Sequence, residues 1–585
     1  MISKIIYIVE KKFFFQIFFL FFLLIISTFL ELISIGSIPI FLMAISDVDQ
    51  FFNKLPFLNN FKYMKLDDSM NLIYFVSFVI IIVFFLKNLF LFFSNYYQGK
   101  LRKHIREDIK EKVLKTYLFM PYKFHLNFNP SLLVRNITHD SIHASDVLFI
   151  VITILKELIL LLLLLLVLIF STPSNTLLLI ILLSLISYVF YFFVRKIVKK
   201  AGIEYRQSTG FELKNLLQSF GSIKETKILS RENYFLNLVK FNIKNIEDSK
   251  FISGLISSVP KLVLEVVTIS SITFVLILYF NLGYEFNQIL PSITLYVVCA
   301  LRMIPAFNTI TTKFTIFKLH SISLNAIYKD LKDNKLTIES TNSLKETDDL
   351  KEKINKILIK NISFGHEKNS YTLKNISMSI LAGEKIGILG KSGSGKSTFV
   401  DLLLGLHLPN EGSILINNHN IKDNFEYWRN KVGFIPQNLY LFDDTIVSNI
   451  TYGLLEKDVD YKKFNYCLKI SNLLGFVNNL KDKEKTLIGN NGIRISGGEK
   501  QRIGIARALY NLPELLIFDE STSALDSNNE SLIMNEIDNL DYKCTKIIIS
   551  HKLGPLLNCD KIYVFDNGRI IHSGSLEEVK NNYII

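Results

Sequence analysis

The chain has 585 residues, 49% of them hydrophobic, and 66 Lys and Arg against 53 Asp and Glu give a formal net charge of +13. This apolarity, with a mean hydropathy of +0.31, excludes a mainly disordered protein and indicates a membrane protein. The four cysteines have no CxxC spacing and no His pairing nearby, which excludes a disulfide scaffold and a zinc module. The positive charge leaves nucleic acid and an anionic membrane surface open as partners.

The long apolar runs lie in residues 1–320, which we expect to form a transmembrane domain. Six runs approach or exceed the ~20 residues that a helix needs to cross a bilayer. They lie near 14–45, 72–97, 145–171, 175–195, 252–280 and 288–312. The chain start, MISKIIYIVEKK, is basic and amphipathic, and no small-residue cleavage site follows it. It therefore favours an interfacial helix over a cleaved signal peptide.

The loops between these runs differ in charge. Two long loops, near 99–144 and 196–251, are rich in basic residues, whereas the turns at 172–175 and 281–287 contain no Lys or Arg. The positive-inside rule therefore places both long loops and both chain termini in the cytoplasm. We expect the helical periodicity of these loops to continue the spans below the membrane, although simple solvated loops are the alternative. A polar, charged linker is predicted at 321–350.

Residues 351–585 have the pattern of a soluble α/β domain. After a strand-like EKIGILG comes GKSGSGKST and then an apolar helix, which is the setting of a phosphate-binding loop. Its glycines let backbone N–H groups face phosphate oxygens. Lys396 supplies charge to the β- and γ-phosphates, and the Ser397 hydroxyl suits Mg²⁺. The residues of this expected site are Gly390, Lys391, Ser392, Gly393, Ser394, Gly395, Lys396, Ser397 and Thr398.

Two further motifs extend this prediction. The segment LLIFDE predicts a buried strand that delivers Asp519 to Mg²⁺ and Glu520 beside the γ-phosphate, where Glu520 would polarise the attacking water. In ISGGEKQR, the residues Ser496, Gly497 and Gly498 open a helix whose N-terminus attracts phosphate. ATP and Mg²⁺ are therefore the expected cofactors.

Together these motifs resemble the ATP-binding cassette transporters over essentially the whole chain, with six spans followed by one cassette as in exporters. The resemblance implies that the SGG segment of one chain faces the phosphate-binding loop of another, with two ATP molecules between them. It implies that Gln437 links the metal site to the membrane domain and that His551 contacts the γ-phosphate. Residues 523–526 resemble the loop that crosses the dimer interface. The presence of both Glu520 and His551 favours a homodimer, with a heterodimer as the alternative.

The sequence departs from the family pattern at three places. Glu499 stands where the signature normally has Gln, and its carboxylate either weakens nucleotide binding or points away. His366 occupies the position of the aromatic residue that stacks on adenine, with Tyr371 as a possible substitute. The stretch TLIGNNG at 486–492 lacks the usual acidic residue after Thr. Segments 121–140 and 218–233 resemble the family's coupling regions.

Charged residues within the apolar runs are costly, so they indicate a function or a partner. Lys87 and Arg302 have no obvious local acid, whereas Lys261 lies four residues before Glu265 on a predicted helix. Internal ion pairs or a position near the headgroups are the alternative for these residues. The same choice applies to three other charges in the spans, Glu31, Lys156 and Glu157.

The stretches KKAGIEYRQ, SVPKLVLE, ALRMIPAFNTI and VGFIPQNLYLFDDTIVSNITYG resemble exporters that flip lipid-linked oligosaccharides. This resemblance implies that Lys87, Lys261 and Arg302 attract the pyrophosphate of a polyprenyl-diphosphate-linked glycan. The expected function is ATP-driven export or flipping of such an amphipathic substrate, with other lipids, drugs or peptides as alternative cargo. The expected location, from a Lys-, Asn- and Ile-rich composition, is a bacterial inner membrane.

Two other classes of protein account for less of the sequence. A cassette protein acting on nucleic acid would explain the charge but not six spans, so nucleic acid is not an expected partner. An ATP-gated sensor or channel would not need Glu520 for turnover. The +13 charge is instead explained by cytoplasmic loops that face an anionic leaflet.

Overall fold

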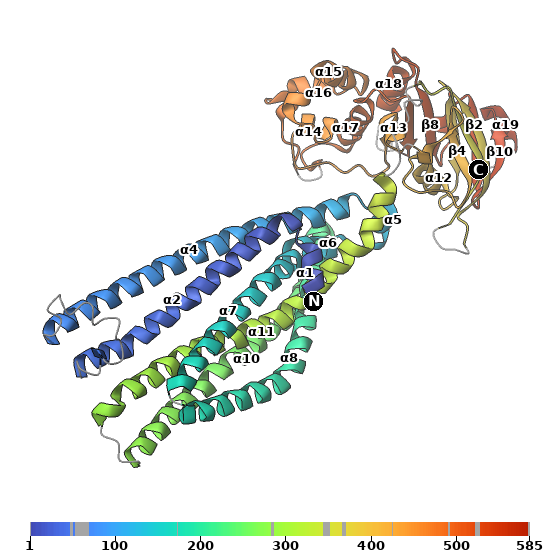
Figure 1. Cartoon of the computed structure of the whole chain (residues 1–585). Coiled ribbons are helices and arrows are strands. Elements are labelled where there is room, and N and C mark those ends of the chain that lie inside the picture. Colours follow the sequence, from blue (N-terminus) through green and yellow to red (C-terminus); the bar gives the residue numbers. More distant parts are fainter. Residues whose placement is uncertain are drawn as a thin grey trace. The chain divides into compact units, whose positions relative to one another are not determined.

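The structure, a computed structural model of the whole chain, separates into two compact units (Figure 1). It describes residues 2–46, 51–52, 69–171, 173–281, 286–342, 352–365, 370–423, 425–489, 492–520 and 527–582. One unit comprises Met1–Met120 and Phe124–Glu339, and the other Pro121–Lys123 and Ser340–Ile585. Each unit is described by itself.

The first unit is built from long helices. They are α1 (Ile2–Ile8), α2 (Phe14–Ser46), α4 (Ser69–Leu118), α7 (Ser141–Ser171), α8 (Pro173–Gly221), α10 (Glu232–Asn281) and α11 (Phe286–Asn342). Short helices connect them, namely α5 (Tyr122–Asn127), α6 (Pro130–Arg135) and α9 (Ile223–Ile228), and a π-helical turn (Asn136–Asp140) leads into α7. Along their lengths, α2 packs on α4 and α8 on α10 (Figure 1).

Five described helical segments are long and apolar enough to cross a membrane. They are Lys11–Ile45, Met70–Leu118, Pro130–Ser171, Glu232–Ile277 and Ile293–Asp333. These segments contain the predicted spans 14–45, 72–97 and 145–171 and most of 252–280 and 288–312. The remaining predicted span, 175–195, lies on α8, where the side chains of nearly all its residues fall outside the described part.

The prediction that the long loops continue as helix is confirmed. Helix α4 has 50 residues, α8 has 49, α10 has 50 and α11 has 57. At about 1.5 Å per residue, 50 residues span about 75 Å, more than twice the ~30 Å hydrocarbon thickness. Each of these helices therefore extends well beyond a single crossing.

Much of the predicted linker at 321–350 is also helical, since α11 continues to Asn342. The physical reason is a sparse apolar stripe at helical spacing, because Leu324, Ile327 and Leu331 are all buried in the first unit's core. The abundant charges between them obscured this stripe in the sequence. Residues 343–350 lie outside the described part of the chain.

The second unit contains two sheets and their helices, which confirms the predicted α/β fold of this domain and a separate helical domain. An antiparallel sheet has the order β2-β1-β4-β5, and a six-stranded sheet has the order β10-β9-β3-β8-β7-β6. The strands are β1 (Lys356–Phe364), β2 (Leu373–Leu381), β3 (Lys385–Gly390), β4 (Glu411–Ile416), β5 (His419–Asn420), β6 (Val432–Ile435), β7 (Leu515–Asp519), β8 (Thr545–Ser550), β9 (Lys561–Asp566) and β10 (Arg569–Gly574).

Helices cover the six-stranded sheet, and alternate strand residues enter two different cores. On β7, Leu516 and Phe518 belong to one buried cluster and Leu515 and Ile517 to the other, as expected for a sheet buried on both faces. The helices are α12 (Lys396–Leu403), α13 (Phe425–Asn430), α14 (Ile446–Thr451), α15 (Tyr461–Ile470), α16 (Leu474–Asn479), α17 (Gly497–Leu509), α18 (Ser527–Asp538) and α19 (Leu576–Asn582).

Candidate nucleotide-binding site

Three neighbouring parallel strands bring the predicted nucleotide motifs to one edge of the sheet. Strand β8 lies between β3 and β7, with Leu389 opposite Ser550 and Asp519 opposite Ile549. The carboxyl ends of parallel strands share an edge, where α/β proteins bind ligands. The phosphate-binding loop after β3, Glu520 after β7 and His551 after β8 therefore meet there.

The loop between β3 and α12 has the backbone conformation that its glycines permit. Gly393 has φ +81° and Gly395 has φ +101°, both in the left-handed region. A Cβ at Gly390 would lie 2.5 Å from the carbonyl oxygen of Phe565 and 2.7 Å from Ser394 Oγ. A side chain at any of these positions would strain the loop, whose helix N-terminus is suited to an anion.

Lys396 holds its ammonium group inside this loop. Its Nζ donates to the carbonyl oxygens of Gly390 at 2.7 Å and Lys391 at 3.0 Å. Burial lowers the pKa of Lys396, while the nearby carboxylates of Glu520 and Asp519 oppose that shift. Of the other loop residues, Ser394 is buried, Gly395 and Thr398 are partly buried, and Lys391, Ser392, Gly393 and Ser397 are exposed.

Glu520 is the point at which the separate motifs converge. Its Oε2 accepts a hydrogen bond from Gln437 Nε2 at 3.0 Å, and its Oε1 lies 3.4 Å from His551 Nδ1 and 4.0 Å from Lys396 Nζ. Glu520 itself has φ +48°, a backbone conformation that costs a residue with a side chain about 1 kcal/mol or more. Such strain clusters at functional sites.

Asp519 supplies the second carboxylate of the site. Burial raises its pKa, the charge of Glu520 raises it further, and Lys396 acts in the opposite direction. The predicted metal ligands Ser397, Gln437 and Asp519 offer hydroxyl, amide and carboxylate oxygens, which is the donor chemistry that Mg²⁺ prefers. A divalent cation would also offset the two adjacent, partly buried negative charges, so these residues fit Mg²⁺.

The signature segment begins α17 with a capping box. Ser496 Oγ accepts from Glu499 N at 3.3 Å, and Glu499 Oε2 accepts from Ser496 N at 2.7 Å. Glu and Gln both perform this role at the third helical position. The Glu499 carboxylate is thus directed back onto its own helix, which favours the expected alternative in which it points away from a nucleotide. Gly497 is exposed and Gly498 partly buried at this helix start.

The other departures are only partly described. His366, residues 490–491 and residues 523–526 lie outside the described part of the chain. The ring hydroxyl of Tyr371 donates to Glu411 Oε1 at 3.1 Å, and the residue is 40% exposed. Two backbone hydrogen bonds join the 486–492 stretch to the start of α14. Ile446 N donates to Thr486 O at 3.1 Å, and Ile488 N donates to Asp444 O at 3.2 Å.

Sequence reasoning missed Arg507, which connects the Gln437 segment to the signature helix. From α17, its guanidinium donates to the carbonyl oxygens of Asn449 at 2.7 Å and Tyr440 at 3.0 Å. It therefore braces the segment that follows Gln437. A single arginine within a helix carries no motif, so the sequence offered no signal for this role.

The predicted substrate cations lie on three helices with different surroundings. Lys87 Nζ lies 4.7 Å from the ring centre of Phe84, on the same helix α4. Lys261 is exposed and, within the described residues, forms no ion pair with Glu265. Arg302 is not a free cation, because its Nε lies 2.7 Å from Glu31 Oε1. Arg302 has no acid nearby in the sequence, but Glu31 on α2, 271 residues away, pairs with it, so the alternative of an internal ion pair holds for this residue.

Comparison with known proteins matches the chain to one family in both units. The ABC transporter transmembrane region matches residues 13–301, and the ABC transporter domain matches residues 373–523. A solved bacterial Atm1-family ABC exporter with ATP bound shares the fold, with a TM-score of 0.78, 19% identity and 98% of both chains covered.

Several curated proteins are similar over a shorter stretch. The ATP-dependent lipid A-core flippase of Francisella tularensis is 39% identical over 224 residues, which cover 38% of this chain and 36% of that protein. The alpha-hemolysin translocation ATP-binding protein HlyB of Escherichia coli is 39% identical over 225 residues, 38% of this chain and 32% of its own length. Multidrug resistance protein 1 of Entamoeba histolytica is 37% identical over 227 residues, 38% of this chain and 17% of its own length. The matched stretches thus cover between 17% and 36% of the length of these relatives.

Proposed function

Because the chain belongs to the ATP-binding cassette transporters, we propose that it hydrolyses ATP to export or flip an amphipathic substrate. The observation that carries this proposal is the convergence of Lys396, Gln437 and His551 on the carboxylate of Glu520. A carboxylate held beside a phosphate-binding loop by three polar groups is suited to orient and polarise a water molecule.

Each group at the site has a separate role in hydrolysis. Lys396 and the loop N–H groups bind the β- and γ-phosphates, while Glu520 accepts hydrogen bonds from the attacking water. His551 contacts the γ-phosphate, and Gln437 couples the site to the membrane domain. Ser397, Asp519 and Gln437 would hold Mg²⁺, which would supply positive charge to the bound phosphates.

The test of this mechanism is Glu520→Gln, which keeps the shape and removes the charge. We expect ATP to bind and the hydrolysis rate to fall about 100-fold or more, the usual contribution of a positioned base. Glu536→Gln, at an exposed position on α18, is the matched control and should hydrolyse ATP normally. Ordinary hydrolysis by Glu520→Gln in liposomes would contradict the role of Glu520.

We propose that two copies of the chain assemble, because each copy carries one phosphate-binding loop and one signature helix start. Both Glu520 and His551 are present, which favours two hydrolytic sites in a homodimer. The measurement is the mass and ATPase activity of the protein expressed alone. An inactive monomer that gains activity only with a second, different cassette chain would favour the heterodimer.

The proposed cargo is a polyprenyl-diphosphate-linked oligosaccharide in a bacterial inner membrane, with both termini in the cytoplasm. Lys87 and Lys261 support it as cations on apolar helices that form no ion pair among the described residues. Arg302 adds less, because Glu31 already neutralises it. Lipid A is the second candidate, since the similar Francisella tularensis protein is named a lipid A-core flippase.

Reconstituted liposomes distinguish these cargoes. We expect a polyprenyl-diphosphate glycan to stimulate ATPase activity and to cross the bilayer, and Lys87→Ala and Lys261→Ala to reduce both. Lys332→Ala, beyond the predicted spans on α11, is the matched control. Equal stimulation by lipid A or by a drug, unaffected by either substitution, would contradict the pyrophosphate role.

A further inference from the structure

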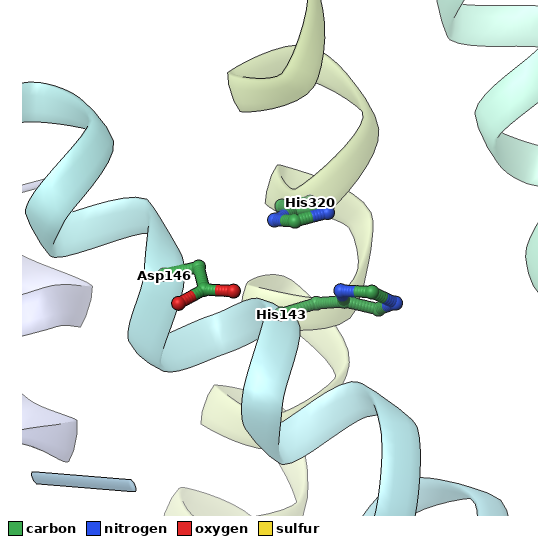
Figure 2. A group of neighbouring side chains, drawn as sticks. All are labelled: His143, Asp146 and His320. Atoms are coloured by element: carbon green, nitrogen blue, oxygen red, sulfur yellow. The ribbon is translucent and has the colours of Figure 1, made fainter. Parts of the chain in front are cut away.

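Two histidines and an aspartate form a cluster between α7 and α11 that plays no part in the ATP site. Figure 2 shows His143 and Asp146 on α7 with their side chains beside His320 of α11. One potential ligand atom from each residue lies within 4.8 Å of the others. The two imidazole rings are 4.1 Å apart between centres, with their planes at 36°.

The imidazole nitrogens of this cluster lack the partners that buried polar atoms normally have. Among the described residues, no group hydrogen-bonds to Nδ1 or Nε2 of His143 or to Nδ1 of His320, and all three atoms are buried. A buried nitrogen without a partner is unfavourable. Ring stacking alone satisfies none of these nitrogens, whereas a metal ion would use the lone pair of one nitrogen from each ring.

Asp146 is oriented for this role by a neighbouring arginine. Its Oδ1 accepts from Arg106 Nη2 of α4 at 2.6 Å, so its other carboxylate oxygen is available to a second partner. Hydrogen bonds of this kind commonly orient metal-ligating carboxylates. The nearby Asp140 is not an equivalent donor, because Arg206 at 2.9 Å and Ser323 at 2.6 Å already occupy its oxygens.

We propose that His143, Asp146 and His320 bind a divalent transition metal ion of the Zn²⁺ type. Two imidazoles and one carboxylate suit such an ion, and a water molecule takes the fourth position. Ligand bonds of about 2.0–2.2 Å place donor atoms about 3.3–3.5 Å apart. The donor atoms, which lie within 4.8 Å of one another, therefore need to approach by about 1.5 Å or less.

The bound ion would join α7 to α11 at one point along both helices. His143 lies two residues into α7, and His320 lies beyond the predicted span 288–312 on α11. A metal bridge there restricts relative movement of the two helices. It is independent of the ATP site and of the identity of the cargo.

The test uses the full-length protein without a histidine tag, in detergent and free of nucleotide, after removal of metals with EDTA. We expect Co²⁺ to bind at one ion per chain with visible absorption bands of four- or five-coordinate geometry, and Zn²⁺ to displace it. The variants His143→Ala, Asp146→Asn and His320→Ala should each weaken Zn²⁺ binding at least about 100-fold, at or beyond the loss typical of ligand-supporting residues.

Two controls keep the test decisive. His104→Ala, at an exposed position on α4, should bind Co²⁺ as the unaltered protein does. Asp146→Asn is nearly isosteric, so it reports on the site even where a histidine variant does not fold. The proposal would be overturned if no stoichiometric Co²⁺ spectrum appeared. It would also be overturned if the His143→Ala/His320→Ala double variant bound Co²⁺ as tightly as the unaltered protein, as it would if the ion occupied the ATP site instead.

Discussion

The ATP site and the charged groups of the helical unit are assembled in different ways. Around the carboxylate of Glu520, the side chains of Lys396, Gln437 and His551 come from segments that follow the strands β3, β6 and β8. In the helical unit, Arg302 of α11 donates to Glu31 of α2, and the ring of His143 on α7 contacts that of His320 on α11. Contacts of the first kind are encoded by local motifs, whereas contacts of the second kind depend on how whole helices pack.

The physical reason lies in the geometry of the two elements. A parallel sheet gathers the residues that follow its strands at one edge, and the register of neighbouring strands fixes their spacing. A helix turns about 100° per residue, so the partner of a buried side chain depends on the rotation of both helices. Neither rotation can be predicted from the sequence.

The largest expected effect concerns the pair formed by Arg302 and Glu31. Arg302→Ala leaves Glu31, which is 8% exposed, without its partner, and removal of one member of a buried pair costs about 3–5 kcal/mol. We expect a fall in thermal stability in detergent that is much larger than for Lys87→Ala. The measurement is the unfolding midpoint of each variant.

The double variant Arg302→Gln/Glu31→Gln distinguishes pairing from a substrate role. It removes both charges and should recover most of the lost stability. A single Arg302→Ala variant as stable as the unaltered protein, but unable to respond to a pyrophosphate-linked cargo, would show that Arg302 acts on the cargo after all.

The same contrast explains which features could be predicted from the sequence. GKSGSGKST, LLIFDE and ISGGEKQR predicted the fold of the cassette and the roles of Lys396 and Glu520 because each motif joins a strand or a helix to its own loop, whereas Gln437 and His551 were expected only from the family resemblance. The pairing of Arg302, the brace at Arg507 and the His143 cluster could not be predicted, since each needs a partner far away in the chain. The helical extension to Asn342 was missed because three buried residues stand among many charges.

A smaller effect is expected at Asp538, whose partners are set by strand register. Lys385 and Lys546 are opposite each other on β3 and β8, and their ammonium groups lie 2.7 Å and 3.0 Å from its carboxylate. Burial acts to raise the pKa of Asp538, but the two lysines outweigh it and the pKa is lowered. The stability that this ion pairing adds is fully present above the pKa of an aspartate in the unfolded chain, about 3.9. It is lost as the pH falls through the lower pKa that Asp538 has in the folded chain.

Asp538→Asn should therefore lower the unfolding free energy of the cassette by about 1 kcal/mol near pH 7. The difference from the unaltered protein should begin to shrink as the pH falls below about 4 and vanish once the pH is below the lowered pKa of folded Asp538. Chemical denaturation at several pH values measures it, with Glu530→Gln on the same helix α18 as the control. A difference that stays constant down to pH 3 would show that charge pairing is not its cause.

The smallest effect is expected at Glu499, which replaces the usual Gln of the signature and caps its own helix through Ser496 N. Glu499→Gln restores the residue that the signature usually has and preserves the capping box, since either side chain accepts from Ser496 N. We expect ATPase activity within about twofold, because the carboxylate serves its own helix. Glu499→Ala removes the contact and should cost about 0.5–1 kcal/mol of stability. If Glu499→Gln greatly raised nucleotide affinity while Glu499→Ala did not, the carboxylate would repel a nucleotide bound by a second copy of the chain. The capping box would then not hold the carboxylate away from that nucleotide.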